Sequence, residues 1–183
     1  MTAPAETAAP ETGQQTEGHT IRRATAADAE RMAEIYAHYV AHSYATFDEQ
    51  PMNAHEWSTR LATLEQAGYP VLVAVAASGT VVGYAYAAPW KLKHAYRPTV
   101  ENSIYIDPLA TGRGLGRRLL VALIVACRGA GHSEMIAVIS DSGSEASLAL
   151  HERAGFRRVG RLENVGCKFG TWIGVHLLQL SLR

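Results

Sequence analysis

One glycine-rich loop limits the folds open to this chain more than any other feature of its sequence. The run TGRGLG, residues 111–116, holds too many glycines for the interior of a helix or a strand. It follows a strand-like run at residues 100–106 and leads directly into a helical stripe of Leu115, Leu119, Leu123 and Cys127. The first N–H groups of a helix lack intrahelical partners and carry the positive end of its dipole, so this loop predicts an anion site, above all for phosphate.

Three arginines at the same helix start, Arg113, Arg117 and Arg118, strengthen the prediction of an anionic ligand. Cations at a helix N-terminus oppose its dipole, so their presence there favours a negatively charged guest. A Walker loop requires GxxxxGK followed by Ser or Thr, and the dinucleotide pattern GxGxxG requires glycine at position 117; neither is present. Two interpretations remain, which are a pyrophosphate site of another type and a glycine-rich turn with a solvated basic end.

Hydrophobic periodicity divides the chain into a disordered N-terminal tail, residues 1–19, and a single domain, residues 20–183. Of the 183 residues 48% are apolar, enough for one core. Strands are expected at residues 21–24, 71–77, 81–88, 100–106, 135–140, 156–164 and 175–182. Helices are expected to begin at about residues 26, 53, 115 and 144. The order is mixed, with an antiparallel beginning followed by βαβ units.

Composition and charge exclude several classes of function. The 17 basic residues equal the 17 acidic ones, so we expect neither a nucleic-acid nor a membrane partner. No signal peptide or membrane span is expected, and two cysteines outside any CxxC pair favour a cytoplasmic protein. His38 and His42 lie one helical turn apart without a third ligand, so no metal is expected.

The strand SIYIDP, the loop TGRGLG and the leucine helix together resemble the acyl-CoA binding motif of the GNAT superfamily of N-acyltransferases. Gly114 and Gly116 match its GxG, and Thr111 stands where Gln or Arg is usual. Within that superfamily the chain is most similar to the phosphinothricin and methionine sulfoximine (or sulfone) acetyltransferase group. The segments that carry this resemblance are IRRATAAD, YATFDEQP, YPVLVA, VVGYAYAAPWK, AYRPTVENSIYIDP, ALHERAGF and VGCKFGTW.

The resemblance implies an α/β fold of the GNAT acyl-CoA N-acyltransferase type. Its sheet would be mixed, mostly antiparallel and seven-stranded, with helices on both faces and a splay between the fourth and fifth strands that admits pantetheine. Acetyl-CoA would be the cosubstrate, and position 144 usually carries Asn in this group. The expected contacts are Ile104, Tyr105 and Ile106 with the pantetheine, Gly112, Arg113, Gly114, Leu115, Gly116 and Arg117 with the pyrophosphate, and Ser144 and Arg153 with the remainder.

Acetyl transfer from a thioester to an amine needs a base, donors for the carbonyl oxygen and a proton for the thiolate, without a metal. Glu101 is the candidate base, because it lies in the otherwise neutral strand TVENSIYI, where burial raises the pKa of a carboxyl. The resemblance indicates the same residue; the alternative is a rim carboxylate paired with a basic side chain. His151, where many superfamily members carry Tyr, is the candidate acid, and the alternative is a packed core histidine. Backbone N–H groups of residues 104–106 are the expected oxyanion donors.

The acceptor pocket is expected to recognise a small acidic amino acid through residues that precede the catalytic strand and through one aromatic wall. Arg holds a carboxylate with two hydrogen bonds, whereas Lys acts as a point charge. The alternative for the two lysines is a solvated hairpin loop. The candidates are Phe47, Trp90, Lys91, Lys93, Tyr96 and Arg97. Lys168 and Trp172 match a C-terminal motif of the group, whereas Gly174 falls where Asp is usual.

The predicted function is acetyl transfer from acetyl-CoA to the amino group of a small amino-acid analogue, by direct transfer in a ternary complex. The KxK after Trp90 resembles phosphinothricin acetyltransferases, and YRPTVE resembles the methionine sulfoximine type, so the acceptor stays open. The alternatives are a peptide N-terminus or polyamine as acceptor, and a non-catalytic acyl-CoA binding module. Members of the group are commonly homodimers, and the apolar run VHLLQLSL at residues 175–182 is compatible with an interface or, equally, with a buried strand.

Overall fold

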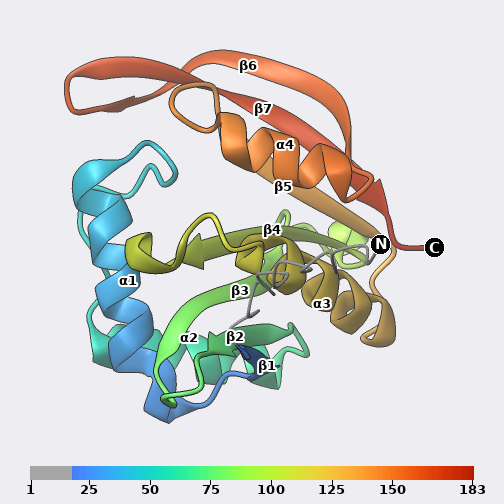
Figure 1. Ribbon diagram of the computed structural model, residues 1–183. Helices are drawn as coiled ribbons and strands as arrows, with labels where there is room; N and C mark the ends of the chain where they lie inside the picture. The colour runs from blue at the N-terminus through green and yellow to red at the C-terminus, as the bar shows by residue number, and fades with distance from the viewer. Residues whose placement is uncertain (1–17) are drawn as a thin grey trace, which may run out of the picture.

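The computed structural model describes residues 18–183, which form a seven-stranded sheet with the strand order β1-β2-β3-β4-β5-β7-β6 (Figure 1). The strands are β1 (Thr20–Arg23), β2 (Val71–Val75), β3 (Val81–Pro89), β4 (Thr99–Ile106), β5 (Glu134–Ser140), β6 (Arg157–Lys168) and β7 (Thr171–Ser181). The helices are α1 (Ala29–His42), α2 (Ala54–Gln66), α3 (Leu115–Gly129) and α4 (Glu145–Arg153), and 3₁₀ turns lie at Ala26–Asp28, His94–Tyr96 and Pro108–Ala110. Of the tail predicted at residues 1–19, all but Gly18 and His19 lie outside the described residues.

Helices cover both faces of the sheet, each over its own core (Figure 1). On one face the fully buried Leu119 and Leu123 of α3 pack against β2 to β5 and β7, and α4 extends this layer. On the other face Met32 of α1 and Trp57 of α2 pack against Tyr84 and its neighbours. Each buried side chain of this size contributes about 1.5–3 kcal/mol. The predicted fold, with helices on both faces of a mixed sheet, is confirmed.

The sheet opens between β4 and β5. These strands are parallel and pair only at Thr99 with Glu134, Val100 with Met135 and Glu101 with Ile136. The five other pairings within residues 18–183 are antiparallel. Beyond Glu101 the two strands part, and β5 leads away with β6, β7 and α4 as a separate wing (Figure 1). The splay expected between the fourth and fifth strands is therefore present.

The sequence located every helix and strand, and the C-terminal hairpin differs most in its bounds. β6 continues to Lys168 and β7 begins at Thr171, because Phe169 and Gly170 take positive φ angles of 52° and 72° and close a tight turn. Most of β6 is exposed, so no alternation of apolar residues marks where it ends. The cap of α2 is as predicted: Glu56 N donates to Asn53 Oδ1 (3.0 Å) and Asn53 N donates to Glu56 Oε2 (2.7 Å).

Candidate active site

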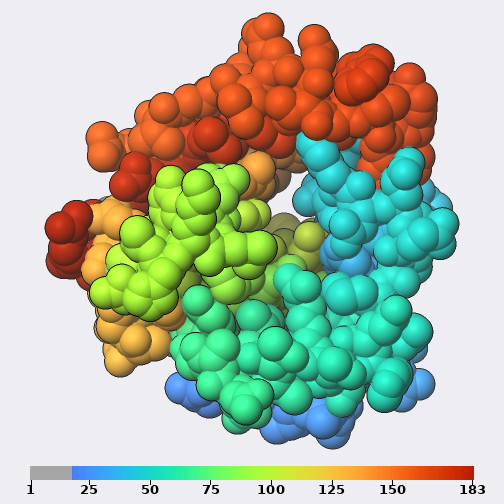
Figure 2. All heavy atoms as spheres, turned by 180° about the vertical axis from the view of Figure 1, so that it is seen from behind, coloured from blue at the N-terminus to red at the C-terminus, as the bar shows by residue number. Residues whose placement is uncertain are grey.

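A cleft of about 790 Å³ is lined by residues from both faces of the sheet where β4 and β5 part. One part of its lining, called here the α1 side, comes from α1, the loop at residues 44–48, α2, β3 and the outer face of β4. The other part, the α3 side, comes from the start of α3, from β5 and from α4. Figure 2 shows the mouth of the cleft as an opening beneath the β6–β7 hairpin, bordered by the 44–50 region and by the segment that follows β3. The gap in the sheet therefore joins its two faces.

On the α3 side, the predicted glycine loop has the conformation of an anion cradle. Gly112 and Gly114 take φ angles of +77° and +72°, in the left-handed region, and a side chain there would meet strain. Gly114 is the N-cap of α3, and the loop faces solvent around the unpaired N–H groups of the helix start. Gly116 lines the cleft, and a Cβ at this position would lie 3.4 Å from Leu150 Cδ2 of α4. These positions fit a phosphate group above the helix end.

Other contacts fix the entry to this loop. Asp107 Oδ1 accepts a hydrogen bond from Leu109 N (2.9 Å), and its carboxylate forms an ion pair with Arg31 of α1. Thr111, where the GNAT pattern has Gln or Arg, lines the cleft and donates through Oγ1 to Pro108 O (3.0 Å). The Thr111 side chain therefore stabilises the turn itself, and its hydroxyl oxygen remains at the cleft surface.

The edge of β4 that faces β5 is open beyond Glu101. Asp107 N donates to Val82 O of the β3 side (2.9 Å), and backbone N–H groups alternate between the two edges of a strand. The N–H groups of Ile104 and Ile106 therefore point to the edge that β5 leaves unpaired. Ile106 O on this edge accepts a hydrogen bond from Tyr39 Oη (2.6 Å). An extended amide-bearing chain fits this edge as a substitute strand.

Glu101 faces the α1 side of the cleft, half-buried in its wall. Its burial raises the pKa of its carboxyl, and the positive charges of Lys91 and Arg60 oppose this rise. None of the hydrogen bonds or ion pairs of residues 18–183 engages the Glu101 carboxylate. The geometry differs from that of a rim carboxylate held in an ion pair, and it leaves the group able to accept a proton.

His151 lies on the α3 side, 4% exposed, and both of its ring nitrogens are engaged. Nδ1 lies 2.8 Å from Ser147 O, and Nε2 lies 2.9 Å from Asn102 Nδ2. A carbonyl only accepts, so Nδ1 carries the proton of the neutral ring and Nε2 accepts from the Asn102 amide. Burial lowers the pKa of His151, while the hydrogen bond to Ser147 opposes this effect. The neutral ring thereby orients Asn102, whose buried Oδ1 has no partner within residues 18–183.

Lys168 holds the loop that covers the α1 side. It is 2% exposed, and its Nζ donates to Ser43 O (2.9 Å) and Thr46 O (2.8 Å). Burial lowers the pKa of Lys168, and Asp48 and Glu49 raise it. The sequence marked Lys168 as a motif residue without a role, and its role here is to tie the end of β6 to the loop.

Gly174, where the group usually carries Asp, has no room for a side chain. A Cβ on Gly174 would lie 2.6 Å from Asp141 Oδ2 and closer still to Leu162 O. Asp141 accepts instead from Gly174 N (2.9 Å) and from Arg161 Nη2 (2.9 Å). The carboxylate of Asp141 thus fills the space next to position 174, which explains this departure from the group pattern.

The predicted acceptor residues lie in two places. Phe47 lines the cleft and packs against Gly166, whereas the five candidates at positions 90–97 do not line it. Lys91 Nζ lies over the ring of Trp90 at 4.6 Å, and the other three are exposed. Their segment borders the mouth of the cleft (Figure 2). Arg60 of α2 lines the cleft and was not singled out from the sequence, because a lone arginine on an amphipathic helix carries no signal.

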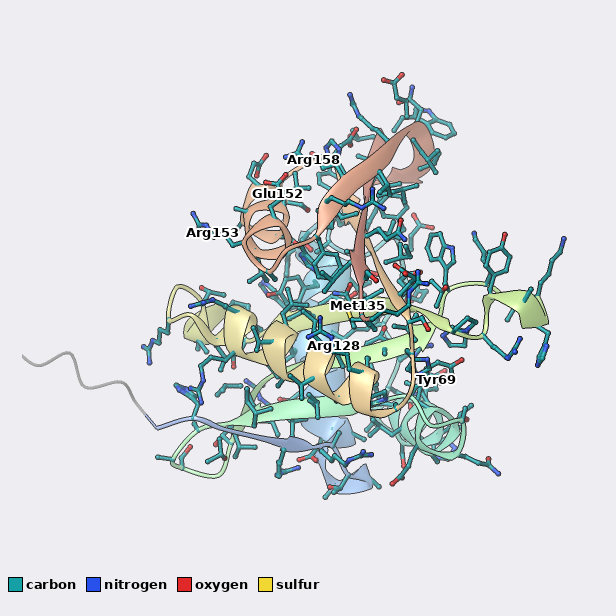
Figure 3. The ribbon with its side chains drawn as sticks, turned by 90° about the vertical axis from the view of Figure 1, so that its right-hand side faces the viewer. Tyr69, Arg128, Met135, Glu152, Arg153 and Arg158 are labelled. Carbon is teal, nitrogen blue, oxygen red and sulfur yellow. The ribbon has the colours of Figure 1, made fainter. Side chains whose placement is uncertain are left out.

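Of the remaining residues predicted to bind the cofactor, some line the cleft and others do not. Ser144 is the N-cap of α4 and lines the cleft, as do Ile104, Tyr105 and Ile106. Leu115 is buried under the loop, and Arg113 and Arg117 are exposed beside it. Arg153 does not line the cleft and extends from α4 away from the sheet (Figure 3).

Residues 18–183 offer neither a metal-ion cluster nor a membrane-spanning helix. They contain no group of three or more His, Cys, Asp or Glu side chains placed to hold a metal ion. Within the same residues, no helix has both the length and the apolar character needed to cross a bilayer. The two cysteines are free, with Cys127 buried as expected from its helical stripe and Cys167 exposed.

A cleft that crosses a split sheet, with a glycine loop on one side and a half-buried carboxylate on the other, agrees with the comparison with known proteins. The family model described as an acetyltransferase (GNAT) domain matches residues 21–177. The chain is a member of the GNAT acetyltransferase family. The predicted family and the predicted class of enzyme, an acetyl-CoA-dependent N-acetyltransferase, are confirmed.

The chain is similar in sequence to individual GNAT relatives over most of their length. A phosphinothricin N-acetyltransferase from Alcaligenes faecalis is 44% identical over 89% of this chain and 82% of its own. An L-methionine sulfoximine/L-methionine sulfone acetyltransferase from Pseudomonas aeruginosa is 39% identical over 89% of this chain and 94% of its own. Among solved structures, a GNAT superfamily phosphinothricin acetyltransferase from Sinorhizobium meliloti in complex with acetyl-CoA has a TM-score of 0.86 at 39% identity and covers 89% of this chain and 88% of that one.

Proposed function

We propose that this GNAT enzyme transfers an acetyl group from acetyl-CoA to the amino group of a small amino-acid analogue of the phosphinothricin, methionine sulfoximine or methionine sulfone type. The observation that carries the proposal is the cleft through the gap between β4 and β5, which joins a phosphate cradle to the half-buried carboxylate of Glu101. The names of the relatives support the type of acceptor. Direct transfer in a ternary complex follows, because the two sides of one cleft hold both substrates at the same time.

The residues of the α3 side fit acetyl-CoA. The positive φ angles of Gly112 and Gly114 and the start of α3 suit its pyrophosphate, with Arg113 and Arg117 beside it. The N–H groups of Ile104 and Ile106 suit the amides of pantetheine. The buried Oδ1 of Asn102, which has no partner within residues 18–183, suits a hydrogen-bond donor of the same ligand. Acetyl-CoA supplies the acetyl group as an activated thioester. No metal is part of this proposal.

Glu101 acts as the base. Its carboxylate removes a proton from the acceptor ammonium, directly or through one water, so that the nitrogen lone pair attacks the thioester carbonyl. The new C–N bond forms as the C–S bond breaks, and the sulfur leaves with the bonding electrons. Within residues 104–106, the N–H groups of Ile104 and Ile106 point to the open edge of β4; one of them stabilises the negative charge that develops on the carbonyl oxygen, and the other binds a pantetheine amide.

His151 was predicted as the acid for the thiolate, and its contacts support a positioning role more strongly. As a neutral ring it has no proton on Nε2, the nitrogen that faces the cleft lining through Asn102. Its pKa is lowered by burial, so the protonated form is scarce at neutral pH. We propose that His151 orients the Asn102 amide, and that the thiolate takes its proton from solvent or from the acceptor's second ammonium proton.

An assay of CoA release tests the function. Acetyl-CoA is incubated with phosphinothricin, methionine sulfoximine, methionine sulfone, a polyamine or a peptide, and free thiol is measured. Turnover with one of the first three supports the proposal, and turnover with the polyamine or the peptide alone supports the rival acceptors. Tight CoA binding without turnover on any amine indicates a non-catalytic binding module and contradicts the proposal.

We further propose a cytoplasmic homodimer. Exposed apolar side chains follow β6 and β7 on the outer edge of the sheet: Val159, Leu162, Val165, Phe169 and Trp172. A long edge strand with exposed apolar residues suits association with a second copy. The free thiols of Cys127 and Cys167 suit a reducing compartment. Sedimentation at several protein concentrations tests the dimer.

A further inference from the structure

Arg60 is the one basic side chain on the lining of the cleft, among the residues that the structure describes. The acidic groups of that lining are Asp48 and Glu101, and His151 is held neutral. The lysines at positions 91 and 93 lie outside the lining. An anion that enters the cleft from the acceptor mouth therefore meets the positive charge of Arg60 before any other within this lining.

The contacts of Arg60 leave its hydrogen-bonding groups unused. Its guanidinium lies over the ring of Tyr86, with Cζ 5.2 Å from the ring centroid. Its Nε is buried and has no acceptor among residues 18–183, and none of their carboxylates forms an ion pair with it. A buried charged donor without a partner is unfavourable unless a ligand supplies one. The contact with Tyr86 uses the charge of the guanidinium and leaves its N–H donors for an anion with two oxygens.

The strand register places Glu101 close to Tyr86, the ring over which Arg60 lies. Tyr86 pairs with Ser103 and Ala88 pairs with Glu101 across β3 and β4, so Tyr86 and Glu101 are diagonal neighbours on the same face. Side chains in that relation are within reach of a single small group. The positive charge of Lys91 acts on the Glu101 carboxyl from outside the lining, and that of Arg60 acts on it from within the lining. An α-amino acid carries its ammonium and carboxylate on adjacent atoms, which matches two opposite charges this close together.

We propose that Arg60 binds the α-carboxylate of a free amino-acid acceptor while Glu101 faces its ammonium group. The proposal rests on the acetyltransferase function proposed above and narrows it. The enzyme then requires a free carboxylate next to the amine, which a peptide N-terminus and a polyamine lack. Arg60 determines specificity for the acceptor and makes no contact with acetyl-CoA.

Two acceptors that differ only at the carboxylate test the proposal. Methionine sulfone and its carboxamide are compared in wild-type enzyme by CoA release, and the free acid is expected to have a kcat/KM at least about tenfold higher. In Arg60→Met this preference is expected to disappear, through a higher KM for the acid and little change for the carboxamide. Arg60→Lys is expected to restore part of the preference, because it keeps the charge without the two-pronged geometry.

Matched measurements separate this inference from the function on which it rests. Arg23→Gln removes an exposed arginine from β1 and is expected to leave both kcat/KM values unchanged. Acetyl-CoA affinity, measured by calorimetry, and the thermal midpoint are expected to be the same in wild type and Arg60→Met. Equal use of acid and carboxamide by wild-type enzyme overturns the inference without any variant, as does an equal loss on both in Arg60→Met. Failure of wild-type enzyme to acetylate any amine contradicts the function itself.

Discussion

The two sides of the cleft are built in different ways. The α3 side is made of backbone: glycines with positive φ, the start of a helix and the open edge of β4. The α1 side is made of side chains that come from α1, α2, β3, β4 and the loop held by Lys168. A backbone site binds a ligand that does not vary, whereas a side-chain site changes its specificity with single substitutions. One domain can thus keep one cosubstrate and vary its acceptor.

This difference predicts where single substitutions act. On the α1 side they are expected to change turnover or acceptor affinity with acetyl-CoA binding intact. On the α3 side they are expected to act through backbone conformation, on cosubstrate affinity and stability. A substitution on the α1 side that weakens acetyl-CoA binding, or one on the α3 side that changes acceptor affinity, would show that the two sides are coupled.

The largest effect is expected for Glu101→Gln. Loss of the base is expected to lower kcat by about 10²- to 10⁴-fold, with acetyl-CoA affinity unchanged. Because burial raises the pKa of Glu101, kcat/KM of the wild type should fall as the pH drops through that raised value, and the variant should lack this acidic limb. Glu30→Gln, an exposed residue of α1, serves as the control. Unchanged turnover in Glu101→Gln would remove the base assignment.

The next largest effect is expected for Lys168→Met. It leaves the half-buried carbonyl group of Ser43 and the buried carbonyl group of Thr46 without their donor, at a cost of about 1–3 kcal/mol in the free energy of unfolding. Because the freed loop carries Phe47 and Asp48 of the α1 side, the KM for the acceptor should rise more than the KM for acetyl-CoA. Urea unfolding and steady-state kinetics measure the two effects. A rise confined to the KM for acetyl-CoA would contradict the division between the sides.

Gly114→Ala tests the α3 side. An alanine in the left-handed region costs about 1–2 kcal/mol, and the strain lies in the loop proposed to bind the pyrophosphate. Lower thermal stability and weaker acetyl-CoA binding are expected, with the acceptor KM unchanged. Gly129→Ala is the matched control: it lies within α3, without a positive φ and with open space around its Cα. That substitution should be neutral or slightly stabilising.

The same division explains what the sequence could predict. The strand, the glycine loop and the helix start at residues 104–117 are contiguous, so one local pattern could predict these elements, and the structure contains them. Their contacts with the cofactor stay a prediction. Acceptor residues were sought in a contiguous segment too, at positions 90–97, but the lining of the α1 side is assembled from distant segments. Arg60 becomes visible only when α2 packs beside β3. Glu101 was found because a lone carboxyl in an apolar strand is unusual wherever it lies.

The smallest expected effect concerns His151 on the α3 side, whose Nε2 contacts the Asn102 amide of β4. Its folded pKa is lowered below 6.5, so the unfolded chain takes up a proton first as the pH falls, and folding stability declines from about pH 6.5 downward. This contribution amounts to at most about 1.4 kcal/mol for each pH unit. The pKa of His132 is also lowered by burial, so it adds an effect of the same sign.

Urea unfolding at pH 7.5 and 5.5 should therefore show a smaller decline in stability for His151→Gln than for wild type, and a still smaller decline when His132→Gln is combined with it. His55→Gln, at an exposed residue, should show the same decline as wild type. If His151 serves only to orient Asn102, His151→Gln should also lower activity by a factor that is independent of pH. An acid role would instead give the wild type a basic limb in its kcat profile that the variant lacks. The profile thus decides whether the Asn102–His151 pair belongs to the binding of acetyl-CoA or to the proton transfer that follows.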